Sequence, residues 1–147
     1  PYQVLQKSLS EANEVVTFVN SLEDCFIFYD MPGKIDDNNL LPLYENTDLL
    51  IIPFSYDQIA FESTMIFVQV AKELNPNIEM VFIPNRIKSN VKFKTESQVN
   101  EILEQYGDIL EKIPERVCFQ RLSVFGNTQE MESICEATFK QLEEKLQ

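Results

Sequence analysis

The chain has 147 residues, 44% of them hydrophobic, with eleven Phe and five Tyr, so it can bury the core of a single domain and is not disordered. Its net charge of −12 makes the chain as a whole a poor ligand for nucleic acid. No apolar run is long enough to cross a bilayer and no basic-then-apolar signal pattern occurs, so we expect a cytoplasmic protein without membrane contact.

The first predicted elements are a short strand at residues 2–5, a helix, and a second strand. Ser8 and Glu11 form a capping-box pattern ahead of an apolar helical face, which indicates where the helix begins. The second strand covers residues 25–29, which are apolar throughout, and it ends at Asp30.

The rest of the chain alternates apolar runs of strand length with stretches of helical period. In chain order we predict a strand at 49–54, a helix opened by Ser55 and running to 74, a strand at 80–83, a polar loop at 85–94, a helix from 95 to 110, a strand at 117–119 and a closing helix after Gly126 and Asn127.

This alternation predicts a three-layer α/β fold for residues 1–147. Strands that are apolar on both faces belong to a mostly parallel sheet with helices on both sides. In such sheets ligands bind beyond the carboxyl ends of the strands, which directs attention to residues 30–37, 54–57, 85–94 and 120–127.

Asp30 is the first candidate for chemistry, because a buried strand delivers its carboxylate directly ahead of a Pro-Gly turn. The chain has no His, so Ser–His and Cys–His catalysis and His-ligated metals are excluded. A carboxylate at a rigid strand end can hold Mg²⁺, and a following Gly amide can approach a phosphate closely. The alternative is an Asp that only starts a tight turn.

Three patterns occur in a fixed order along the chain. They are Asp30-Met-Pro-Gly33, then Thr47-Asp48 leading a strand that ends at Pro53, then a strand that ends at Asn85-Arg86. In this order they resemble the ParA/MinD/Soj group of P-loop ATPases. Cys118-Phe-Gln-Arg121 followed by Gly126-Asn-Thr-Gln-Glu130 is similar to the last strand and the closing helix of that family. Each pattern is weak alone, and their shared order over the whole chain makes the resemblance moderately specific.

The resemblance implies a P-loop NTPase-like fold and a role for each matching residue. Asp30 would order Mg²⁺, Pro32 and Gly33 would begin the switch that senses the γ-phosphate, and Asn85 would read the adenine edge. Arg86 would flank the base or the phosphates. The plainer alternatives are a turn Asp and an Asn that ends a strand.

One departure from the family is decisive, because the chain has no phosphate-binding loop. Its three glycines, Gly33, Gly107 and Gly126, form no G-x-x-x-x-G-K-[ST] pattern. We therefore expect a fragment, incomplete at its N-terminus, of a larger ATPase domain that uses ATP and Mg²⁺, or a degenerate relative. The chain itself should hold neither ligand tightly, and whether it is an enzyme stays open.

The resemblance also implies that the missing strand is central to the sheet. Its loss would expose the main chain of residues 25–29 and of residues 49–52. We expect the neighbouring strands to close this gap or a second copy to fill it.

The family further implies a nucleotide-gated dimer in the parent protein, a partner protein of the partitioning type, and non-specific DNA binding. The loop at 85–94 supplies the cations for DNA, namely Arg86, Lys88, Lys92 and Lys94, with no acid among them. A solvated loop is the alternative.

Two other classes of protein compete with the partitioning ATPase. The first is a non-catalytic interaction module that keeps the fold without the chemistry. The second is a receiver-like domain, which also has an Asp and a Met-Pro-Gly stretch. A receiver needs an acidic pair at the end of its first strand, and residues 2–10 offer none, which argues against it.

Overall fold

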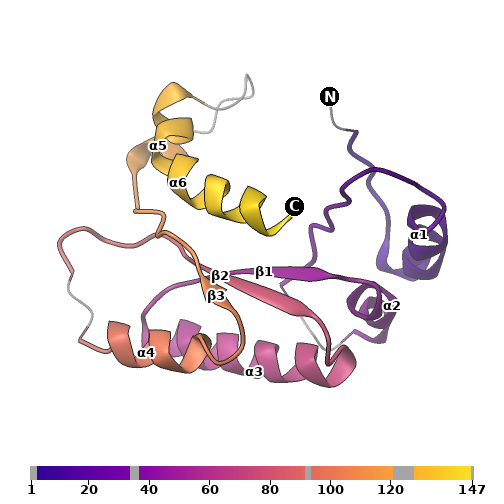
Figure 1. The fold of residues 1–147 in the computed structure, drawn as a ribbon, viewed down its shortest axis with the longest axis horizontal. Coiled ribbons are helices and arrows are strands. Elements are labelled where there is room, and N and C mark those ends of the chain that lie inside the picture. Colours follow the sequence, from indigo (N-terminus) through magenta and orange to yellow (C-terminus); the bar gives the residue numbers. More distant parts are fainter. Residues whose placement is uncertain (1–2, 34–36, 92–93, 121–127, 147) are drawn as a thin grey trace. The chain divides into compact units, whose positions relative to one another are not determined.

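The computed structural model of the chain describes residues 3–33, 37–91, 94–120 and 128–146 (Figure 1). Contacts between residues divide the chain into two compact units. Unit 1 comprises Pro1–Asp48 and Gln69–Ile78, and unit 2 comprises Leu49–Val68 and Glu79–Gln147. Each unit is described by itself.

Unit 1 opens with the predicted helix, which begins as the 3₁₀ turn η1 (Leu9–Glu11) and continues as α1 (Ala12–Val19). The capping box is confirmed, because the Ser8 N–H donates to Oε2 of Glu11 over 2.9 Å. The Lys7 ammonium lies 2.8 Å from Oε1 of Glu11, and together these contacts lower the pKa of Glu11 to about 2. The start of this helix is therefore determined locally by its sequence.

Two further short helices in unit 1 were not predicted, η2 (Asn38–Leu40) and α2 (Leu41–Glu45). Asp37 begins them by accepting a hydrogen bond from the Asn39 N–H over 3.0 Å. The Asn75 side chain donates to the Tyr44 carbonyl and to a second carbonyl, each over 3.1 Å, which satisfies the end of α2. Helices this short owe their stability to such tertiary contacts, so sequence periodicity does not reveal them.

The predicted strand at residues 25–29 is wrong. The chain runs without a turn or bend from residue 25 to residue 32, but it forms no strand there. Phe26 and Phe28 are each 67% exposed and Ile27 is 39% exposed. The residues have high strand propensity, but a strand requires a hydrogen-bonded neighbour. Residues 3–5 likewise form no strand, and Tyr2 lies outside the described residues.

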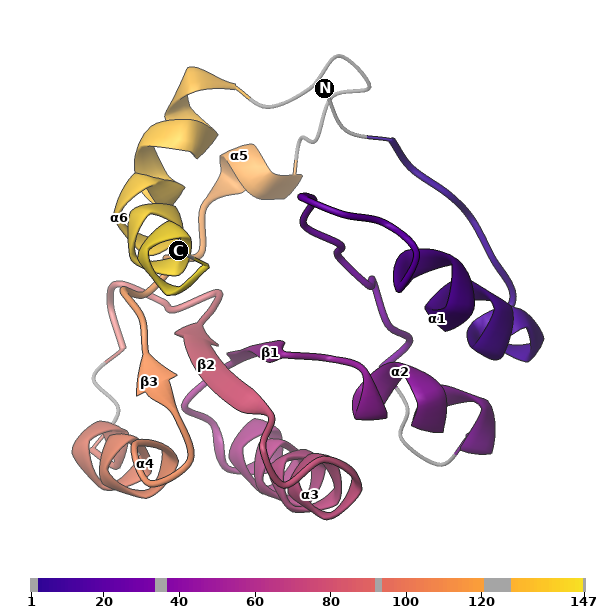
Figure 2. The ribbon, with the colours of Figure 1, turned by 45° about the vertical axis from the view of Figure 1, so that its right-hand side comes forward.

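Unit 2 contains a parallel sheet of three strands in the order β1-β2-β3 (Figure 2). The strands are β1 (Leu49–Phe54), β2 (Glu79–Pro84) and β3 (Asp108–Ile109). In the register Ile52 lies beside Phe82, and Phe82 lies beside Ile109. The parallel sheet and the first two of these strands confirm the prediction, whereas β3 lies inside what was predicted to be a helix.

The helices that follow the strands of unit 2 are α3 (Gln58–Leu74), α4 (Glu96–Leu103), α5 (Val117–Gln120) and α6 (Gln129–Lys145). The last residues of α3, from Gln69 onward, belong to unit 1. The predicted helix at 95–110 ends early, at Leu103, and the Gly107 N–H donates to the Leu103 carbonyl over 3.2 Å as the chain turns into β3. The predicted strand at 117–119 is instead α5.

Helices cover both faces of this sheet, with α3 and α4 on one side and α6 on the other (Figures 1 and 2). On the α6 side the core is formed by Val81, Ile83 and Leu110, against which Leu142 of α6 packs. On the opposite face the rings of Phe54 and Phe82 meet edge to face at 6.3 Å. Unit 2 thus has the predicted three-layer α/β arrangement.

Strand β1 has β2 as its single hydrogen-bonded neighbour within the described ranges. The Asn85 N–H donates to the Phe54 carbonyl over 2.7 Å. The N–H and C=O groups of the even-numbered residues of β1 therefore face β2. Leu49, Ile51 and Pro53 therefore point theirs toward the open edge. Within the described part of unit 2, this side of β1 therefore has no hydrogen-bonded strand beside it.

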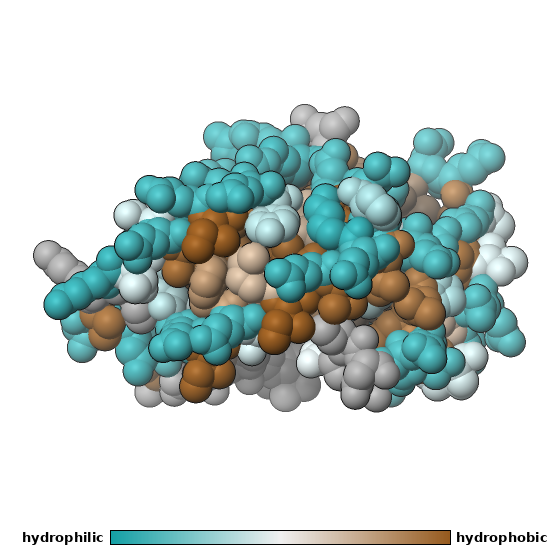
Figure 3. All heavy atoms as spheres, turned by 90° about the horizontal axis from the view of Figure 1, so that it is seen from below, coloured by the Kyte–Doolittle hydropathy of each residue, from teal (hydrophilic) through white to brown (hydrophobic). Residues whose placement is uncertain are grey.

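None of the helices in the described part of the chain is both long enough and apolar enough to cross a membrane. Single hydrophobic side chains are exposed on α3 and α4, namely Ile59, Ile66 and Ile102. Figure 3 shows that side of the molecule, where hydrophobic side chains lie among hydrophilic ones. Isolated exposed side chains of this kind are ordinary in soluble domains.

Candidate functional site

Asn85 and Arg86 lie at the carboxyl end of β2, where parallel sheets bind ligands. The main chain of Asn85 joins β2 to the end of β1 through the bond to the Phe54 carbonyl. Its side-chain Oδ1 accepts from the Arg86 N–H over 2.9 Å, which leaves the amide NH₂ of the half-buried Asn85 available as a donor. Asn85 is thus fixed in position by the backbone on both sides.

Arg86 has a φ of +57°, a conformation that residues other than Gly rarely adopt. Backbone strain of this kind recurs at ligand-binding turns, and it persists only where neighbouring contacts stabilise the conformation. Here the next residue, Ile87, is held by two main-chain hydrogen bonds. The Ile87 N–H donates to the Ile113 carbonyl over 3.2 Å, and the Glu115 N–H donates to the Ile87 carbonyl over 3.0 Å. The Arg86 guanidinium, 79% exposed, lies 3.8 Å from the Glu115 carboxylate.

The end of β1 holds a second polar turn, at residues 55–57. Oδ1 of Asp57 accepts from the Ala60 N–H over 2.9 Å, and Oδ2 accepts from the Ser55 hydroxyl. Both hydrogen bonds lower the pKa of the Asp57 carboxyl group, and the bond from Ser55 has the larger effect. Asp57 is therefore occupied as the cap of α3, although Ser55 was predicted to open that helix.

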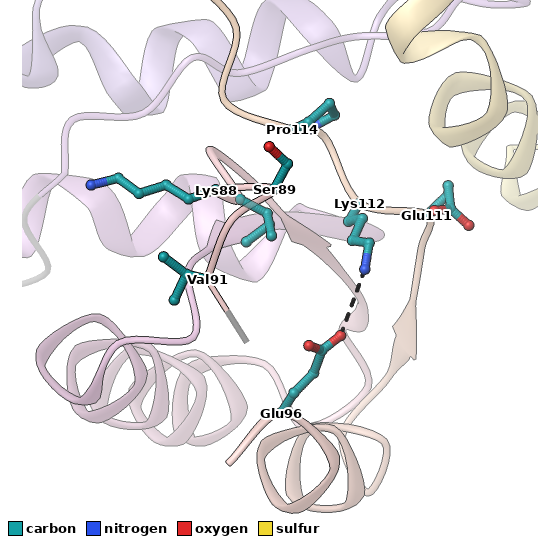
Figure 4. Close-up of a pocket in the computed structure, with 8 residues that line it drawn as sticks. Lys88, Ser89, Val91, Glu96, Glu111, Lys112 and Pro114 are labelled. Atoms are coloured by element: carbon teal, nitrogen blue, oxygen red, sulfur yellow. Dashed lines mark ion pairs between the residues drawn. The ribbon is translucent and has the colours of Figure 1, made fainter. Parts of the chain in front are cut away.

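A pocket of about 620 Å³ lies between the loop after β2 and the segment after β3 (Figure 4). Its volume is in the range of small-molecule sites. Its walls combine hydrophobic side chains with two lysines and two glutamates: Ile87, Lys88, Ser89, Val91, Glu96, Glu111, Lys112 and Pro114. The Lys112 ammonium points toward the Glu96 carboxylate at 3.9 Å, whereas Lys88 points away from this pair.

Sequence reasoning missed the wall of this pocket at residues 111–114. That segment follows β3, which was hidden in a predicted helix, so nothing directed attention to it. The signal that could have found it is Gly107 ahead of the short apolar run Ile109-Leu110, since Gly in a helical pattern marks a helix end.

Asp30, Pro32 and Gly33 lie in unit 1, whereas Asn85 and Arg86 lie in unit 2. The Asp30 side chain is exposed, and a Cβ on Gly33 would meet no atom within 4 Å. No group of three or more acidic, Cys or His residues that could hold a metal occurs among the described residues. A lone carboxylate fits Mg²⁺ only in the mode in which phosphate oxygens and waters supply the other ligands.

The predicted cationic loop is only partly described. Lys88 and Lys94 are exposed, Arg86 is paired with Glu115, and Lys92 lies outside the described residues.

No protein-family model matches the chain, and no curated protein matches it. Among solved structures the chain is similar to a plasmid partition protein from Borrelia burgdorferi, with 27% identity and a TM-score of 0.45. The match covers 70% of this chain and 41% of that protein, so the chain spans less than half the length of that relative.

The positive φ of Arg86 predicts how substitutions at this position change the free energy of unfolding. Arg86→Gly should leave the free energy of unfolding within about 0.5 kcal/mol of wild type, because Gly adopts positive φ without a clash while gaining freedom in the unfolded chain. Arg86→Val should lower it by about 1–2 kcal/mol, because the branched side chain is forced into the same conformation. Both variants lose the ion pair to Glu115, so urea denaturation of the two isolates the backbone effect. Equal stabilities would contradict it.

Proposed function

We propose that this chain is the C-terminal portion of a ParA-like partitioning or positioning ATPase, which acts in the parent protein as a dimer gated by Mg-ATP. The observation that carries the proposal is the order of three patterns in the sequence. They are Asp30-Met-Pro-Gly33, the strand that ends at Pro53, and the strand that ends at Asn85-Arg86. It is supported by the position of Asn85 at the carboxyl end of a parallel strand, next to the strained residue Arg86.

In this proposal Asp30 holds Mg²⁺ together with phosphate oxygens and water, and Pro32 and Gly33 respond to the γ-phosphate. The open surroundings of Gly33 leave room for a phosphate to approach its amide. Asn85 offers its NH₂ to the adenine edge, and Arg86 exchanges its weak, exposed contact with Glu115 for the base or phosphates. Magnesium and ATP supply the charge and the reacting group, and these side chains bind and orient them.

The partners in the proposal are a second ATPase subunit, a partner protein and non-specific DNA. The exposed ammonium groups of Lys88 and Lys94 would contact DNA phosphates in the ATP-bound parent protein, together with Arg86 and Lys92. Cytoplasmic location is part of the same proposal.

The isolated chain should release no phosphate from Mg-ATP above the blank. It has no G-x-x-x-x-G-K-[ST] loop, and no other residue replaces the lysine and amides that stabilise the transferring phosphate. The measurement is colorimetric phosphate release with wild type and Asp30→Ala. Turnover that is present in wild type and absent in Asp30→Ala would overturn this prediction.

The reading frame that encodes residues before Pro1 distinguishes the two main candidates. A K-G-G-x-G-K-[ST] motif there supports the ATPase, and a start codon immediately before the Pro1 codon supports an interaction module that lacks the chemistry.

A further inference from the structure

The segment that follows β3 in unit 2 runs along the buried face of α6. Leu142 of α6 packs against the cluster that contains Leu110, and the Thr138 hydroxyl donates to the Glu111 carbonyl over 2.8 Å. The next helix, α5, also contacts α6, and both ribbon views place it beside the amino-terminal half of α6 (Figures 1 and 2). From residue 110 onward the chain therefore follows α6 from its carboxyl end toward its amino end.

Two cysteines lie at this contact, one on each helix. Cys135 is 6% exposed and lies in the amino-terminal half of α6, on the same face as the buried Met131 and Thr138. Cys118 is half-buried and lies on α5. Burial, and after it the Cys118 thiol, raise the pKa of the Cys135 thiol, so the two thiols are close enough to interact.

The two thiols differ in their access to solvent. Both are free, but Cys118 is partly exposed whereas Cys135 is buried. Redox-sensing proteins pair an accessible cysteine, which a peroxide oxidises first, with a neighbouring cysteine that resolves the product. The contact between α5 and α6 has this division of access. Cys25, the third cysteine of the chain, lies in unit 1 and is not part of the pair.

We propose that Cys118 and Cys135 form a redox-active pair, which a hydroperoxide converts reversibly into a disulfide that joins α5 to α6. The Cys118 thiolate attacks the peroxide: an S–O bond forms, the O–O bond breaks, and the leaving oxygen takes up a proton to give water or an alcohol. The Cys135 sulfur then attacks the Cys118 sulfur, so that the S–S bond forms and the S–O bond breaks. The hydroxide that leaves takes the Cys135 proton and becomes water. The two thiols together lose two electrons and two protons, which an external thiol returns.

The disulfide would act on the candidate site through a short stretch of main chain. Cys118 follows closely after Ile113 and Glu115, whose hydrogen bonds to Ile87 hold the turn at Arg86. Tying α5 to α6 therefore restricts the local opening of the segment that stabilises this turn. The pairing of the thiols rests on unit 2 alone and does not depend on the proposed ATPase function.

The test treats the full chain carrying Cys25→Ser with hydrogen peroxide, so that two of its three cysteines remain. Trypsin digestion without reductant should release residues 117–121 joined to residues 122–140, because Arg116, Arg121 and Lys140 bound these two peptides. Dithiothreitol should separate them. Light scattering should show a monomer throughout, since the disulfide is within one chain. Hydrogen exchange at the amides of Ile113 and Glu115 should become about tenfold slower after oxidation.

Two further variants test the order of the steps. Cys25→Ser with Cys135→Ser should accumulate a sulfenic acid at Cys118, which dimedone traps, because the resolving thiol is gone. Cys25→Ser with Cys118→Ser should keep Cys135 as a thiol over the same time, because this residue is buried. Peptide mapping of the Cys25→Ser chain keeps the test decisive even if either double variant fails to fold.

Three outcomes would overturn the proposal. The first is peroxide treatment that yields no link between residues 117–121 and 122–140. The second is a link that forms only in urea, since the two thiols would then not be neighbours in the folded chain. The third is reaction of Cys135 with peroxide as fast as that of Cys118. No nucleotide enters the assay, so a negative result leaves the proposed ATPase function standing.

Discussion

Gly107→Ala should destabilise unit 2 by about 3 kcal/mol, measured as the free energy of unfolding in urea. A Cβ at this position would lie 2.0 Å from the carbonyl oxygen of Met80 and 2.7 Å from its carbonyl carbon. Both are main-chain atoms of β2, so no side-chain rotation relieves the clash. The turn into β3 and the strand that carries Asn85 would have to move apart.

Gly33→Ala is the matched control, because a Cβ at Gly33 would meet nothing within 4 Å. We expect its unfolding free energy to stay within about 0.5 kcal/mol of wild type. If both variants lost the same stability, close packing of Gly107 on β2 could not be the cause.

Phe82→Ala should lower the free energy of unfolding by about 3–5 kcal/mol. Phe82 is fully buried in the central strand, and its ring packs edge to face against Phe54 with an interplanar angle of 89°. Removing the ring leaves a cavity between the sheet and the helices on that face. The carboxyl end of β2 should lose protection from hydrogen exchange at the same time.

Phe139→Ala in α6 provides the comparison, because this Phe is 50% exposed. We expect a loss of about 1 kcal/mol or less, since little surface leaves water when it packs. Comparable losses for the two variants would mean that the sheet does not form the core of unit 2.

The strands β1 and β2 were predictable because residues 49–54 and 80–83 are continuously apolar, which is the pattern of strands in a sheet with helices on both faces. The helices α1 and α6 were predictable from their periodicity and from caps such as Ser8 with Glu11. The range of α3 was predictable as well, but Ile59 and Ile66, which were expected on its buried face, are exposed. Strand β3 was not, since it has two residues and gains its pairing from Val81 and Phe82 rather than from its own sequence. The short run at 117–119 fits a strand or a helix equally, and tertiary contacts decide it.

The stretch at residues 25–29 shows most clearly what sequence does not determine. Its propensity for a strand is strong, yet pairing requires a neighbour, and propensity contains no information about whether one is present. The same applies to the candidate site. The position of Asn85 at a strand end was predictable, whereas the positive φ of Arg86 and the pocket depend on contacts with residues 111–115, far along the chain.

The central claim, that this chain belongs to a Mg-ATP-dependent ATPase, is tested most directly by ATP hydrolysis in the polypeptide that joins it to a K-G-G-x-G-K-[ST] loop. We expect Mg-dependent turnover that falls about a hundredfold in Asp30→Asn and is kept in Asp24→Asn, which removes the same charge at the other end of residues 25–29. Turnover at the wild-type rate in Asp30→Asn, or no binding of Mg-ATP by the wild-type polypeptide, would contradict it.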